Sequence, residues 1–157
     1  MTLSKSAREF HRKTGARSFN EAWVYLEKKR RTRTDDRRML DLVHASRLHW
    51  GLVGTDRNRA IADWQISRVY AALGESQLAL NYARSSLSLC RKSHLTASLG
   101  SAHEGLARAL AIAKDFPAAR KHLTRAQKLF AALLLDDEDR RTYLDRLEET
   151  ERLIPRK

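Results

Sequence analysis

The chain is poor in cysteine, proline and glycine, the residues that are typical of small secreted, fibrous or loop-rich proteins. Its 157 residues include one cysteine, two prolines and six glycines. A single cysteine excludes an internal disulfide, and the scarcity of proline and glycine argues against an all-β or disordered chain. Cys90 stands 40 residues from both Trp50 and Phe130. We therefore predict that Cys90 is a small buried apolar side chain in a protein of a reducing compartment.

Long apolar runs are also missing. The N-terminal residues contain no apolar stretch of signal-peptide length, and no run approaches the ~18 apolar residues of a membrane span. We expect a cytoplasmic protein with no membrane contact. A hydrophobic content of 42% with 32% charged residues is typical of a helix-rich globular domain, and this length suits one continuous core.

Positive charge dominates the chain and is unevenly distributed. The net charge is +12; residues 1–59 hold 15 Lys and Arg against 7 Asp and Glu, whereas residues 60–157 hold 16 against 12. The positive charge is concentrated in a run of basic residues between positions 28 and 38. Because a positive field attracts polyanions, this basic run predicts an acidic partner or nucleic acid. The alternative is a solvated helix end whose cations complement the helix dipole. The candidate polyanion contacts are Lys29, Arg30, Arg31, Arg33 and Arg37.

What the chain does have is a repeat of 40 residues. Small and apolar residues recur at that offset in three copies, as a stacked array of repeats requires. The aligned sets are Ala22, Ala62 and Ala102; Leu26, Ile66 and Leu106; Lys28, Arg68 and Arg108; Asp35, Glu75 and Asp115; Val43, Ala83 and Leu123; and Ser46, Ser86 and Ala126.

Helical spacing of the apolar residues predicts the elements of this array. Residues 1–17 form a basic arm or a short helix that Gly15 interrupts, and Ser18 caps the first helix of the repeat domain, residues 18–157. Pro117 fits the first turn of a later helix. We expect a second helix from about residue 35 to 53 and a third from about 56 to 73. Four more are expected at about 75–91, 96–113, 116–134 and from 136 onwards.

The run Tyr70-Ala71-Ala72-Leu73-Gly74-Glu75, followed by Ala79 and Ala83, resembles the tetratricopeptide repeat, as does its counterpart from Leu110 to Ala126. The resemblance covers roughly residues 18–134. Its period is 40 where the family's is 34, which implies longer helices. It implies an all-α, right-handed solenoid of about three helical hairpins with a capping helix. The chain is also similar to small prokaryotic helical-repeat proteins that carry a stretch like His44–Trp50 and have no assigned activity.

The resemblance further implies a site, because the first helix of each pair lines a concave face that receives extended peptides. On this chain, Lys28, Arg68 and Arg108 would form a ladder of exposed cations that grips carboxylates, with Trp64 as an apolar platform. The paired asparagines of the carboxylate-clamp subtype are missing, since Lys28 and Gln65 occupy their positions. The candidate peptide-binding residues are Lys28, Ile61, Trp64, Arg68, Glu104 and Arg108.

Two histidines invite a catalytic interpretation. His44 and His49 lie five apart, about 140° around a helix, so they do not form an i, i+4 metal pair. Asp41 and His44 stand one turn apart, but Ser46 falls at a helix crossing with no room for a substrate. We interpret His49 as a hydrogen-bonded interior residue and predict no catalytic residue, no metal and no cofactor, there being no glycine-rich phosphate loop.

The sequence thus predicts a non-enzymatic adaptor that binds an acidic or extended peptide in a concave basic groove. A nucleic-acid-associated protein that uses the N-terminal basic face is the alternative. A small-molecule sensor or enzyme around His44, Arg47 and Trp50 is the third hypothesis. Open ends of the array also favour a homodimer, with Phe10, Phe19 and Trp23 near the N-terminal end.

Overall fold

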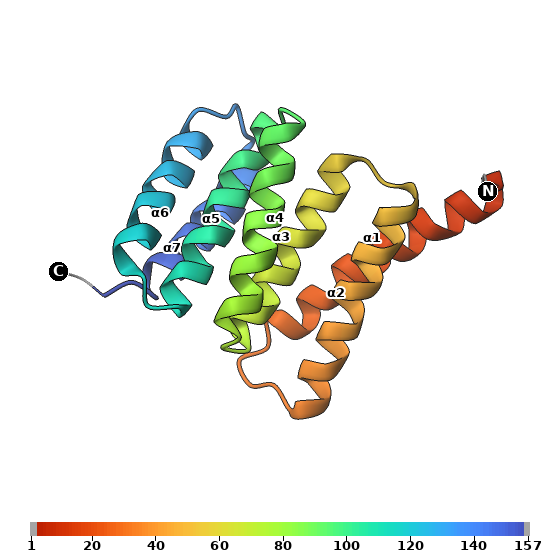
Figure 1. The fold of residues 1–157 in the computed structure, drawn as a ribbon, viewed down its shortest axis with the longest axis horizontal. Coiled ribbons are helices and arrows are strands. Elements are labelled where there is room, and N and C mark those ends of the chain that lie inside the picture. Colours follow the sequence, from red (N-terminus) through yellow and green to blue (C-terminus); the bar gives the residue numbers. More distant parts are fainter. Residues whose placement is uncertain (1–2, 156–157) are drawn as a thin grey trace.

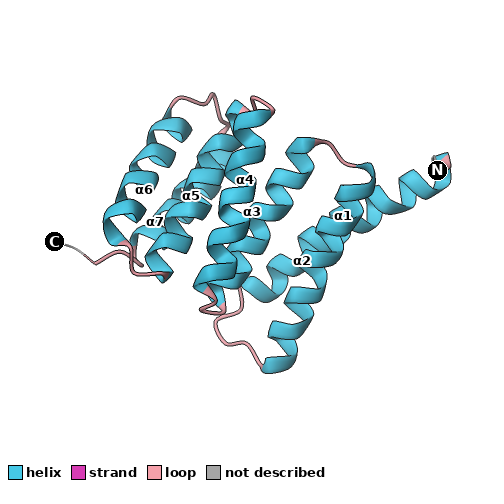
Figure 2. Cartoon of the chain, in the orientation of Figure 1, coloured by secondary structure: helices cyan, strands magenta, loops and turns pink. Residues whose placement is uncertain are grey.

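A computed structural model describes residues 3–155, which fold as an all-α array of helical hairpins. Consecutive helices pack in pairs, and the paired layers follow one another along the molecule, with the chain ends at opposite sides (Figure 1). Only helices and short loops are present in the described range (Figure 2). The predicted fold class is confirmed. The helices are α1 (Lys5–Leu26), α2 (Arg33–Val53), α3 (Asp56–Ala72), α4 (Ser76–Lys92), α5 (Thr96–Ile112), α6 (Phe116–Ala131) and α7 (Asp137–Glu151).

The four central helices repeat with a shorter period inside the 40-residue one. α3, α4, α5 and α6 begin at residues 56, 76, 96 and 116, so each helix and its turn occupy the same length of chain. The three turns have the same conformation, with a left-handed residue at Gly74 (φ 78°), His94 (φ 52°) and Lys114 (φ 63°). One local turn motif therefore connects each helix to the next from α3 to α6.

A hydrogen bond closes each of these turns over the end of the preceding helix. The backbone N–H of Glu75 donates to the carbonyl of Tyr70, that of Leu95 to Cys90, and that of Asp115 to Leu110, each at 2.9 Å. This bond, five residues back along the chain, satisfies a carbonyl that the helix end leaves without a partner. The turn explains why each helix stops where it does.

Alanines at the helix crossings allow close packing, as the repeat predicts. Ala62, Ala83, Ala102 and Ala119 are all at most 1% exposed. Cys90 lies in the same core at 1% exposure, and burial raises the pKa of its thiol to about 11. Its predicted place as a buried apolar side chain is confirmed, and the neutral thiol is a poor nucleophile.

The first hairpin departs from the prediction. α1 is one continuous helix that begins after the N-cap Ser4, so Gly15 does not interrupt it and Ser18 is a buried helical residue, not a cap. The predicted division at residues 17 and 18 falls inside this helix, and residues 1 and 2 of the predicted arm lie outside the described range. Gly15 leaves room for a neighbouring ring: a Cβ there would lie 3.1 Å from Cε2 of Trp50, a tight contact. From the sequence alone, Gly15 is interpreted as a helix breaker, whereas in the structure it gives space to the ring of Trp50.

The last helix, α7, packs on both α5 and α6 and reaches back across the array, where it lies behind α5 in the view of Figure 1. It buries only Leu147 and Thr150 of its own length, with Ile154 just beyond its end. Asp136 caps its N-terminus by accepting a hydrogen bond from the backbone N–H of Asp139. The position of α7 decides which residues of the predicted concave site are accessible.

Candidate functional site

The predicted concave face is covered by α7. Arg68 and Arg108 both bind the carboxylate of Glu149 on α7, at 2.6 and 3.0 Å. The side chain of Arg68 is only 4% exposed and that of Arg108 only 14%. The prediction that both arginines are exposed is therefore wrong. They do grip a carboxylate, but it belongs to the same chain.

Glu104 forms the centre of this buried network. Its carboxylate accepts hydrogen bonds from the Trp64 indole (2.9 Å), the Arg68 guanidinium (2.8 Å) and the Thr150 hydroxyl (2.6 Å). Burial by itself would raise the pKa of Glu104, but the nearby charges of Arg68 and Arg108 hold that pKa below its usual range. Glu104 is a structural anion that neutralises the buried arginines.

Two tryptophans complete the covered face. The rings of Trp23 and Trp64 lie 5.7 Å apart, and the Arg146 guanidinium of α7 stands over both, 5.1 and 4.8 Å from their centroids. Trp64 is 4% exposed, so it is not an open platform for a peptide. The cation–π contacts instead hold α7 in place.

Lys28 and Ile61 do not join the predicted ladder. α1 ends at Leu26, so Lys28 lies in the following loop, where it pairs with Asp35 at 2.6 Å. The Lys28 ammonium is the leading cause that lowers the pKa of Asp35 to about 2. Ile61 lines a separate small cavity with Phe19 and Trp50. Residues 40 positions apart therefore no longer occupy equivalent places at the end of the first helix.

The N-terminal basic run is mostly free in the structure. Lys29, Arg30, Arg33 and Arg37 are exposed. Arg31 is only half-exposed, because it pairs with Asp36 at 2.7 Å and donates to the carbonyl of Ala72. These residues stay candidates for polyanion contact.

The stretch from His44 to Trp50 does not form one site. Nε2 of His44 lies 2.9 Å from the Tyr70 hydroxyl, whereas the Ser46 hydroxyl donates to the carbonyl of Gly15. Arg47 pairs with Asp63 on α3. His49 is hydrogen-bonded as predicted, to His11, but it is half-buried and not interior. Their polar atoms point to different partners, so the structure brings no Ser, His and Asp together here.

A groove that the sequence did not predict opens on the outer side of the array, between α4 and α6. It has a volume of about 1170 Å³. α5 forms its floor, because α4 and α6 each pack on α5 and not on each other in the described structure. Leu87, Leu99, Leu106 and Leu129 supply its apolar surface. Its rims carry six cations, Arg84, Arg91, Lys92, Lys121, Arg125 and Lys128.

These cations form no ion pair in the described part of the chain, although the charge of Lys92 helps to lower the pKa of Asp56. All six are exposed, and within residues 3–155 none has an Asp or Glu oxygen within 4.0 Å. α4 and α6 contain no Asp or Glu at all. Their charges therefore add to a strong positive field that is focused over an apolar floor.

A histidine pair lies in the same groove. Nδ1 of His103 on α5 is 2.8 Å from Nδ1 of His122 on α6, with the rings stacked. Burial, then His122, Arg91 and Arg125, lower the pKa of His103 to about 4. Such a pair shares one proton between the two nitrogens and stays neutral at pH 7. The groove therefore holds its positive charge on the rims and a neutral polar pair at its floor.

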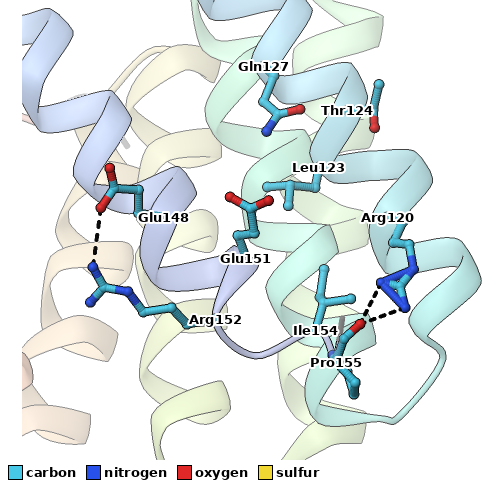
Figure 3. Close-up of a pocket in the computed structure, with 9 residues that line it drawn as sticks. All are labelled: Arg120, Leu123, Thr124, Gln127, Glu148, Glu151, Arg152, Ile154 and Pro155. Carbon is cyan, nitrogen blue, oxygen red and sulfur yellow. Dashed lines mark hydrogen bonds and ion pairs between the residues drawn. The ribbon is translucent and has the colours of Figure 1, made fainter. Parts of the chain in front are cut away.

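A second cleft, between α6 and α7, shows the contrast. It has about 910 Å³ and mixes cations with acids. Figure 3 shows that both of its arginines are already engaged: Arg120 donates to the carbonyl of Pro155 and Arg152 contacts Glu148 at 3.2 Å. This cleft has no unbalanced field to offer a charged partner.

The signal for the outer groove was present in the sequence. Between residues 76 and 131 there are nine Lys and Arg against two acids, Glu104 and Asp115. The excess was hidden because residues 132–157 add eight acids, which lower the average charge of the second half. Counting charge by helix, and not by half-chain, would have revealed it.

Comparisons with protein-family models, with curated proteins and with solved structures give no match for this chain. Within residues 3–155 no three His, Cys, Asp or Glu side chains gather as metal ligands. No helix of that range has the length and apolar character needed to cross a bilayer.

Proposed function

We propose that this protein is a non-enzymatic interaction module, of the tetratricopeptide type, which holds an acidic partner in the groove between α4 and α6. The observation that carries the proposal is six exposed cations around one groove, on two helices without a carboxylate. Unbalanced charge of one sign over a hollow attracts an opposite charge from a partner. The concave face is not the proposed site, because α7 covers its arginines.

A short labelled oligoglutamate peptide tests this proposal by fluorescence anisotropy. The double variant Lys121→Glu/Arg125→Glu reverses two exposed groove charges, so we expect it to weaken binding by about ten-fold or more. The matched control is Arg30→Glu/Arg33→Glu, which makes the same change in net charge on exposed residues outside the groove. Equal losses in both variants would mean attraction by net charge alone and would overturn the proposal.

Nucleic acid is the competing partner for a protein of this charge. A labelled single-stranded oligonucleotide in the same assay separates the two. We expect it to bind more weakly than the acidic peptide, because the groove has no Trp, Tyr or Phe on which bases could stack. Tighter oligonucleotide binding that the Arg30→Glu/Arg33→Glu variant abolishes would assign the function to the N-terminal basic face instead.

A further inference from the structure

The chain contains an internal reference for the α4–α6 groove, one repeat earlier, between α2 and α4. There, Asp63 on the intervening helix α3 is bound by Arg47 from α2 and by Ser85 from α4. These side chains bridge the space between the helices. At the same offset of 40 residues, His103 replaces Asp63, Arg125 replaces Ser85 and Leu87 replaces Arg47. The polar bridge to both neighbouring helices is thereby reduced to one bond, from His103 to His122 on α6, while Leu87 leaves the α4 side apolar and Arg125 forms no ion pair within residues 3–155.

The floor of the α4–α6 groove has the pattern of a helix-binding surface. Leu99, His103 and Leu106 follow one another on α5 at spacings of four and three residues, so they lie on one face of that helix. Leu87 and Leu129 add apolar side chains from the two walls. An apolar strip between two parallel walls is the shape into which an amphipathic helix lays its apolar face.

The cations lie where the polar flanks of such a helix would pass. Lys121, Arg125 and Lys128 are spaced by four and three residues along one face of α6, and Arg84 and Arg91 lie seven apart on α4. Seven residues of helix span about 10 Å, roughly two turns. A partner helix of two to three turns could therefore place acids against both rims while its apolar stripe meets the floor.

The opposite face of the array already holds a helix of this chemistry. α7 carries seven Asp and Glu against three Arg, and it docks by placing Glu149 between two arginines and Leu147 and Thr150 in the core. Its contacts combine an acid on cations with a short apolar strip. The outer groove offers the same combination, without an occupant from the described residues.

We infer that the occupant of the α4–α6 groove is an amphipathic α-helix of a partner protein, with an apolar stripe at i, i+3, i+4 and i+7 and acidic residues on both sides. This inference rests on the proposed function and specifies its partner. It requires more than negative charge, since the apolar floor must be covered. That requirement makes it testable separately.

Three peptides test it by anisotropy and circular dichroism. The first has leucines at the stated spacing with glutamates on both flanks, the second has the same composition with the leucines dispersed, and the third is oligoglutamate. We expect the first to bind at least about ten-fold more tightly than the others, in line with burial of one or two leucines, and to gain helix on binding. If the dispersed peptide binds equally well, the inference fails while the proposed function stands. If none binds, both fail.

Variants of the floor complete the test. Leu129 is half-buried, so Leu129→Gln should leave the fold intact and weaken the first peptide by several-fold without changing oligoglutamate binding. The matched control is Leu78→Gln, which alters an exposed leucine of α4 outside the groove. Thermal melts of both variants establish that they are folded. Unchanged affinity of a folded Leu129→Gln variant for the first peptide would overturn the inference.

Discussion

The indole Nε1 of Trp64 donates a hydrogen bond of 2.9 Å to Glu104, the residue 40 positions further along the chain. Equivalent positions of neighbouring repeats thus touch directly. Their closeness also depends on Gly105, where a Cβ would lie 2.6 Å from Cδ1 of Trp64. The repeat is held together here by a buried anion and not only by apolar packing.

Replacement of Glu104 should therefore be costly. Glu104→Gln leaves Arg68 and Arg108 without their buried counter-charge, and we expect the free energy of unfolding to fall by about 3–5 kcal/mol. Urea denaturation measures this. Glu148→Gln is the control, because Glu148 is 62% exposed in an i, i+4 pair, and it should cost well under about 1 kcal/mol. Equal effects would contradict the central role of Glu104.

The left-handed turns predict a gain in stability. Lys114 has φ 63°, a conformation that costs a side-chain-bearing residue about 1–2 kcal/mol. Lys114→Gly should raise the free energy of unfolding by roughly 0.5–1 kcal/mol, after allowance for the added freedom of the unfolded chain. Lys114→Ala removes the same charge but keeps the Cβ, so it should show no such gain. Gly74→Ala, at φ 78°, should lose about 1 kcal/mol.

The helix crossings predict sensitivity to side-chain volume. Ala119 on α6 is fully buried, so Ala119→Leu should overpack the crossing and lower the free energy of unfolding by about 1–3 kcal/mol. Ala131→Leu, at an exposed position of the same helix, serves as the control. Thermal melts of Ala119→Leu that coincide with those of the parent would contradict the observed register of α6 on its neighbours.

The histidine pair predicts a loss of stability in acid. The unfolded chain protonates His103 near its ordinary pKa of about 6.5, whereas the folded protein lowers that pKa to about 4, through burial and the nearby His122, Arg91 and Arg125. Between these two pH values the unfolded state binds more protons. The stabilising contribution is therefore complete above about pH 6.5 and is lost as the pH falls toward 4.

Nuclear magnetic resonance of the folded protein checks this directly, because the ring protons of His103 should titrate near pH 4. His103→Gln should have a shallower decline in stability between pH 6.5 and 4 than the parent. A His103 resonance that titrates near 6.5 in the folded state would refute the prediction.

Much of the fold could be predicted from the sequence because its signals are local. The spacing of apolar residues marked each helix from α2 to α7 to within a few residues, and Gly74 and Pro117 marked a turn and a helix start. The small residues of the 40-residue repeat located the crossings, as the burial of Ala62 and Ala102 confirms. Each of these depends on residues within a few turns of one another, or on one repeated pattern.

Only the tertiary structure decided which of the predicted site residues are accessible to a partner. The space that Gly15 leaves is filled by Trp50, which is 35 positions away, and the guanidinium of Arg68 is engaged by Glu149, which is 81 away. A charge is available for binding only when no opposite charge reaches it, and distance along the chain does not reveal that. The amino-acid sequence by itself determined an all-α array with an excess of cations. The packing of α7 and the separation of α4 from α6 decided which of these cations are paired with acids and which are not.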